Sequence, residues 1–150
     1  MSSAALIRDK VQRMLVDEMN LNVRLISNGF QVPFESTAVN IVVIEQGEGD
    51  SARVLLKMWA PILREVLETP ELFRWIAVEG TAFYFGHACW NPDEDNPGSG
   101  MLSFDHTLLG DYLDLPELYA ALGALATTAD ELDDSLRPRF GGRRFVDSDQ

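Results

Sequence analysis

The chain has 150 residues, of which 46% are hydrophobic and 24% charged, a composition typical of one soluble globular domain. Its 24 acidic and 12 basic side chains give a formal net charge of −12, and no basic stripe is present, which excludes binding to nucleic acids or anionic membranes. The single cysteine, Cys89, excludes an intramolecular disulfide, and the longest apolar runs are too short to span a bilayer. The first residues lack the pattern of a signal peptide, so we expect a cytoplasmic protein.

The N-terminal half predicts one helix followed by three strands. Apolar residues share one face of a helix from about Ser3 to Met19. The dipeptide Asn28-Gly29, between two apolar runs, predicts a hairpin because both residues tolerate positive φ. Two clearer strands, Val39 to Glu45 and Arg53 to Trp59, each have one fully apolar face and a second face that is only partly polar.

The second helix and the hairpin after it have clear start and stop signals. Thr69-Pro70 predicts the start of a helix that ends at Gly80, since threonine caps well and proline suits the first helical position. Thr81 to Trp90 and Met101 to Leu108 are predicted to form a hairpin across a long acidic loop.

The last helix is predicted from a capping box and a repeat of apolar residues. Asp114 with Glu117 marks its start, and Gly141-Gly142 marks its end. Along it an apolar heptad seam predicts packing on a partner helix or across a sheet: Leu118, Leu122, Leu125, Ala129, Leu132 and Leu136. Together the elements predict an α+β fold, with an antiparallel sheet flanked by helices. We expect one domain over residues 1–142 and a flexible tail over residues 143–150.

Two apolar surfaces are candidates for partner contacts. The partly apolar second face of the sheet predicts a protein-binding surface around Val42, Ile44, Leu55 and Trp59. The second helix is apolar around most of its circumference, which predicts either burial within one chain or a homodimer contact through Leu72, Phe73 and Ile76.

One constellation has the residue types of a metal site. His87 and Cys89 share a strand face, and symmetric pairing of the hairpin would bring His106 close to them on that face. Imidazole and thiolate are good zinc ligands, so a zinc-dependent enzyme is the alternative from another class. The same pattern fits a buried thiol and two hydrogen-bonded imidazoles among aromatic residues, and that interpretation predicts no cofactor.

Two acidic segments stand out as well. The loop at residues 93–96 lacks the spacing of a calcium loop and fits a solvated hairpin tip. Near the end of the last helix, four carboxylates oppose the helix dipole: Asp130, Glu131, Asp133 and Asp134. Either the arginines that follow compensate these charges, or the carboxylates form a docking surface for a basic partner.

Five short motifs spread over nearly the whole chain carry a family resemblance: Ala60-Pro61-Ile62-Leu63, Thr69-Pro70-Glu71-Leu72, His106-Thr107-Leu108-Leu109-Gly110-Asp111, Ala129-Asp130-Glu131-Leu132-Asp133 and Phe140-Gly141-Gly142-Arg143. With the order of elements, they make the chain similar to type III secretion chaperones and, more closely, to YbjN-like domain proteins of bacteria. The resemblance implies an acidic, cytoplasmic, non-enzymatic binder of protein segments that is commonly a homodimer. We therefore expect a chaperone-like adaptor, with the zinc enzyme and a regulatory dimer without a client as the alternatives.

Overall fold

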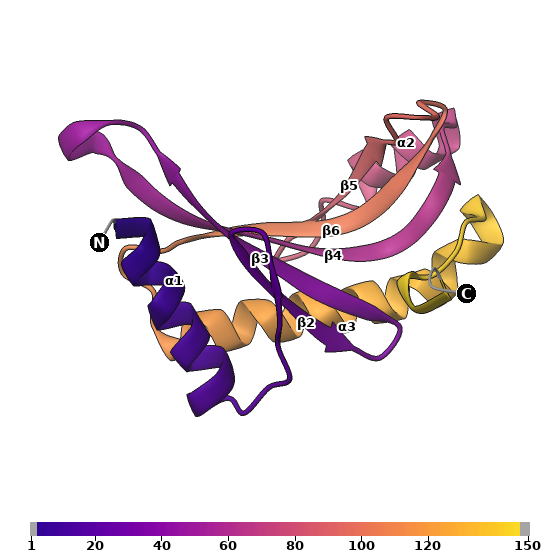
Figure 1. The fold of residues 1–150 in the computed structure, drawn as a ribbon. Coiled ribbons are helices and arrows are strands. Elements are labelled where there is room, and N and C mark those ends of the chain that lie inside the picture. The colour runs from indigo at the N-terminus through magenta and orange to yellow at the C-terminus, as the bar shows by residue number, and fades with distance from the viewer. Residues whose placement is uncertain (1–2, 148–150) are drawn as a thin grey trace.

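The computed structural model describes residues 3–147, which form one antiparallel sheet with helices packed against it (Figure 1). In chain order the elements are α1 (Ser3–Arg13), the π-helical turn η1 (Met14–Glu18), β1 (Arg24–Ile26), β2 (Gly29–Phe34), β3 (Thr37–Gln46), the 3₁₀ turn η2 (Gly49–Ser51), β4 (Arg53–Leu67), α2 (Pro70–Val78), β5 (His87–Pro92), β6 (Ser99–Leu109), α3 (Leu115–Phe140) and the 3₁₀ turn η3 (Phe145–Asp147). The predicted α+β class with an antiparallel sheet is confirmed, and four strands precede α2 where the sequence predicted three.

The six strands lie in the order β1-β2-β3-β4-β6-β5, and every neighbouring pair is antiparallel. β4 is the longest strand, and it pairs with β3 up to Trp59 and with β6 over nearly its whole length. Register shifts between Pro61 and Val66 mark bulges, which bend a strand and strengthen its twist. β4 and β6 curve accordingly along their length (Figure 1).

Local capping explains where α2 and α3 begin. The Thr69 side chain accepts a hydrogen bond from Leu72 N at 3.1 Å, and Asp114 Oδ1 accepts one from Glu117 N at 2.9 Å. Each bond satisfies an amide that would otherwise lack a partner in the first helical turn. Both helix starts were predicted correctly.

The core lies between one face of the sheet and the helices α1 and α3, which both cover that face (Figure 1). The sheet supplies alternate side chains of β3 and β4, such as Val39, Ile41 and Leu56, and α3 supplies its predicted apolar seam. α2 lies beside β5, where Phe73 contacts Trp90, and reaches the end of α3, where Trp75 contacts Phe140. Within residues 3–147 no helix is both long and apolar enough to cross a membrane.

Two strand boundaries differ from the sequence prediction. β4 continues past Trp59 to Leu67, because Pro61 falls where β4 no longer pairs with β3, a position that tolerates a missing amide. β5 begins only at His87, since residues 81–86 form an irregular connection.

The predicted tail is held down over its described part. Arg143 pairs with Arg64 of β4 through two backbone hydrogen bonds, of 2.7 and 2.9 Å, and Val146 N donates to Ser36 O at 3.1 Å. Residues 148–150 of the predicted tail lie outside the described residues.

Candidate functional site

No α-helix lies on the second face of the sheet in the part of the chain that the structure describes (Figure 1), and only the short turn η3 borders this face at one end, where Phe145 lines a depression with Asn40 and Trp59. We call this second face the open face and define it by the side chains that alternate with the core residues: Gln31, Asn40, Val42, Ile44, Leu55, Lys57, Trp59, Cys89, Asn91, Met101, Ser103 and Asp105. The register sets them in rows, with Val42 opposite Lys57 and Ile44 opposite Leu55. Apolar and polar side chains therefore mix on the surface of five strands, β2 to β6.

The structure brings together the four residues predicted to bind a partner. Val42, Leu55 and Trp59 are half-buried, and Ile44 is 38% exposed. Val42, Ile44 and Trp59 line one shallow depression of about 360 Å³, which extends across β4 and β6 to Cys89 on β5. None of the four side chains is enclosed by the rest of the described chain, so all remain available for contact.

Several residues of this depression were not predicted as site residues. Lys57 and Asp105 add one charge of each sign, and Met101 and Asn91 extend the surface towards the edge strand. Alternation along residues 101–105 was the available signal in the sequence. It could not be used alone, because the register between β4 and β6 depends on bulges that pattern analysis does not reveal.

The three residues of the alternative zinc site, His87, Cys89 and His106, are not brought together on one face. His87 and Cys89 do lie on the same side of the sheet as the open face, and they pair with Asp105 and Ser103. His106 follows Asp105 directly and so lies on the opposite face, with its ring 5.8 Å from that of Phe85. Within residues 3–147 no group of three or more histidine, cysteine or acidic side chains could hold a metal ion.

The electrostatics of Cys89 disfavour nucleophilic chemistry at its thiol. Burial, with a smaller effect of the Asp105 carboxylate, raises the pKa of the Cys89 thiol, so the reactive thiolate is suppressed. Burial also lowers the pKa of His106, and His87 adds to this effect.

The residues predicted to mediate self-association are separated by the fold. Leu72 is fully buried in the core, which removes it from any surface contact. Phe73 is 41% exposed and packs edge-on against Trp90, and Ile76 is half-buried against the core. The homodimer stays a prediction, now confined to Phe73 and Ile76.

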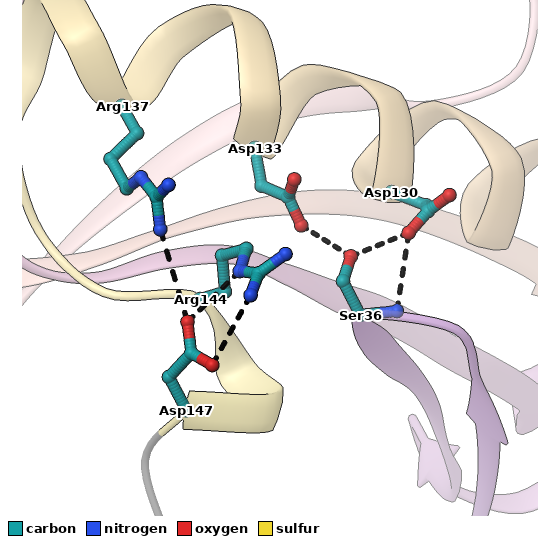
Figure 2. Close-up of polar contacts among 6 residues, drawn as sticks. All are labelled: Ser36, Asp130, Asp133, Arg137, Arg144 and Asp147. Carbon is teal, nitrogen blue, oxygen red and sulfur yellow. Dashed lines mark hydrogen bonds and ion pairs between the residues drawn. The ribbon is translucent and has the colours of Figure 1, made fainter.

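The acidic run near the end of α3 is largely a structural element. Figure 2 shows Asp130 and Asp133 directed at Ser36, in the turn between β2 and β3. Asp130 Oδ1 accepts hydrogen bonds from Ser36 N at 3.1 Å and Ser36 Oγ at 2.5 Å, and Asp133 Oδ2 is hydrogen-bonded to the same hydroxyl. Asp133 is only 1% exposed, which removes it from the predicted docking surface, whereas Glu131 and Asp134 are exposed.

The hydroxyl of Ser36 has a single proton for two carboxyl groups, and this limits their charge. Ser36 Oγ is placed to donate to either carboxylate, but its one proton can serve only one of them at a time, and Asp130 already receives the backbone amide as well. Burial raises the pKa of Asp133 to about 6, opposed by the Ser36 hydrogen bond and reinforced by Asp134 and Asp130. Among the arginines expected to compensate the run, Arg144 pairs with Asp147 at 2.9 Å, and Arg137 lies 3.9 Å from Asp147. The charges of Asp133 and Asp134 also act on Arg144, so the run is compensated in part.

Comparisons with known proteins agree with this architecture. The family model described as "T3SS (YopN, CesT) and YbjN peptide-binding chaperone 1", TY-Chap1, matches residues 3–148. The crystal structure of YbjN from E. coli is similar in fold, with a TM-score of 0.60, 13% identity, and coverage of 87% of this chain and 90% of YbjN. A chain in the crystal structure of the ExsC-ExsE complex gives a TM-score of 0.57 and 20% identity, covering 85% of this chain and 93% of that chain.

No curated protein matches the sequence. The two structural likenesses are below 25% identity and establish the fold, whereas the family model spans nearly the whole sequence. The chain therefore belongs to the TY-Chap1 family of peptide-binding chaperones.

Proposed function

We propose that this protein is a non-enzymatic chaperone-like adaptor that holds an extended segment of a partner polypeptide on its open face. The observation that carries the proposal is the presence of Val42, Ile44, Leu55 and Trp59 on a sheet face that no α-helix covers in residues 3–147. Apolar side chains on an uncovered surface lower the free energy when a partner removes them from water.

The opposite face cannot serve the same purpose. It forms the core with α1 and α3, and its side chains such as Val39, Ile41 and Leu56 have no exposed surface. The family membership supports peptide binding as the general activity. A segment in extended conformation fits the open face best, because it can place alternate side chains into a shallow depression while it keeps its backbone solvated or paired.

Peptide selection followed by surface substitution tests this proposal. The purified protein is used to select binders from a random peptide library, and the affinity of a selected peptide is measured by fluorescence anisotropy. Trp59→Asp and Ile44→Asp place a charge in the proposed contact, and we expect at least tenfold weaker binding for each. Two positions are used because Ile44 is exposed enough to accept aspartate without unfolding the sheet.

Tyr119→Asp is the matched control, since Tyr119 is an aromatic residue on α3 with 69% exposure, away from the open face. The Tyr119→Asp variant should bind the selected peptide with the same affinity as the unmodified protein. Circular dichroism should show that all three variants are folded. Selected peptides that bind both open-face variants as well as they bind the control would refute the proposal, and so would a library that yields no binder.

A further inference from the structure

The open face continues into two more depressions towards the far end of β4. The first, of about 490 Å³, shares Trp59 and Met101 with the depression already described and reaches Arg64 and Arg143. The second, of about 670 Å³, shares Glu65 and Asp93 with the first and ends among the residues of the β5–β6 loop. The three depressions follow one another with shared lining residues, and we call this series the groove.

The chemistry of the groove changes along its length. At its start the charges of Lys57 and Asp105 balance, and apolar side chains dominate. In the middle Arg143 is neutralised by Glu65 at 2.6 Å, and the guanidinium of Arg64 lies 4.9 Å from the centre of the Phe145 ring. At its end lie three carboxylates, Asp93, Glu94 and Asp95, and none of them forms an ion pair within residues 3–147.

The fold fixes the acidic end in place. Within the loop, Asp93 N donates to Ser99 O and Ser99 N donates to Asn96 O, both at 2.9 Å. Glu68 N, directly after β4, donates to Gly98 O and ties the loop to the end of that strand. Glu65 adopts φ +57° at the β4 bulge, a left-handed conformation that is uncommon for glutamate. Bulges of this kind redirect side chains, and here the carboxylate of Glu65 lines both outer depressions.

We propose that the partner segment is an extended peptide with apolar residues at one end and basic residues at the other. Its apolar end lies on the open face and its basic end lies against Asp93, Glu94 and Asp95. Trp59 and Leu67 are eight residues apart on β4, about 26 Å of extended strand at most, so a segment of roughly eight to ten residues covers the groove. A second copy of this chain is a poor occupant, because its net charge of −12 opposes the acidic end.

This inference rests on the proposed function, and designed peptides test it separately. Three fluorescein-labelled peptides of about ten residues share one apolar half and differ in the other half, which contains lysines, serines or glutamates. Each is made in both orders, because the groove does not fix the direction of the bound chain. We expect the lysine peptide to bind about tenfold more tightly than the serine peptide in low salt, and the glutamate peptide to bind most weakly. The lysine preference should shrink at high salt.

Neutralising the acidic end gives the matched comparison. The triple variant Asp93→Asn, Glu94→Gln and Asp95→Asn should lose the lysine preference and retain the affinity for the serine peptide. A control variant, Asp9→Asn, Asp17→Asn and Glu18→Gln, removes the same number of exposed charges from the α1 and η1 segment and should keep the preference.

The outcomes separate the two proposals. Equal binding of the serine and lysine peptides, or equal loss of preference in both triple variants, would overturn this inference and leave peptide binding on the open face intact. Failure of all the peptides to bind would count against this inference, whereas the function itself is decided by the library selection and the open-face variants.

Discussion

The Asp133→Asn variant should become more stable, relative to the unmodified protein, as the pH rises. In the folded protein Asp133 is buried against Ser36, and one of its oxygens, Oδ1, has no hydrogen-bond partner. Ionisation leaves a buried charge beside Asp130 and Asp134, and the single Ser36 proton cannot serve both neighbouring carboxylates. Asparagine stays neutral, and its amide can donate to Ser36 Oγ as the protonated carboxyl group does.

The magnitude follows from the pKa. The folded protein raises the pKa of Asp133 from 3.8 to about 6. The folded state therefore binds the proton more tightly than the unfolded state, and stability is highest below pH 3.8 and is lost as the pH rises through 6. At 1.36 kcal/mol per pKa unit the full loss is about 3 kcal/mol, of which about 2 kcal/mol falls between pH 4.5 and 7.5.

Urea unfolding, followed by tryptophan fluorescence at pH 4.5 and 7.5, measures this effect. We subtract the unfolding free energy of the unmodified protein from that of the variant at each pH. This difference should increase by about 2 kcal/mol from pH 4.5 to pH 7.5. Using the difference cancels the titration of the other carboxylates. Glu131→Gln, at an exposed position on the same helix, is the control and should give a difference that hardly changes with pH. A difference for Asp133→Asn that stays constant with pH would refute the reasoning.

Three further substitutions test the framework. Gly123→Ala should stabilise the protein by about 0.5–1 kcal/mol in thermal unfolding, because Gly123 is inside α3 and a Cβ there meets nothing within 4 Å; destabilisation would show an unseen contact. Asp114→Ala should lower the free energy of unfolding by about 1 kcal/mol in the same assay, because Glu117 N loses its cap, and Asp114→Asn should retain most of the stability of the unmodified protein. If α2 mediates self-association, Phe73→Glu should halve the mass measured by light scattering, whereas an unmodified protein that is already monomeric would contradict the dimer.

The sequence predicted most of the elements because their signals are local. The caps at Thr69 and Asp114 and the Asn28-Gly29 turn each act within a few residues. The start of β5 was misplaced because the alternating aromatics Phe83 and Phe85 imitate a strand. They lie instead in an irregular segment, where Phe83 packs edge-on against Phe104 at 4.9 Å.

The candidate site was predictable only in part. Strand alternation was enough to put Val42, Ile44, Leu55 and Trp59 on one face, since that face depends on period-two geometry alone. The role of Asp133 could not be predicted, because its partner Ser36 lies 97 positions away in the sequence. The acidic end of the groove depends in the same way on a bulge in β4 and on the pairing of β5 with β6.

The bridge between Arg143 and Arg64 has a consequence for how a guest polypeptide can approach. Beyond Trp59, β4 leaves its β3-facing border without a neighbouring strand, and such borders invite strands from other molecules to add on. The residues after α3 occupy that border at Arg64 with the chain's own backbone. The protein's own backbone thus blocks strand addition at this one point of β4, so a partner cannot pair with Arg64 through its backbone.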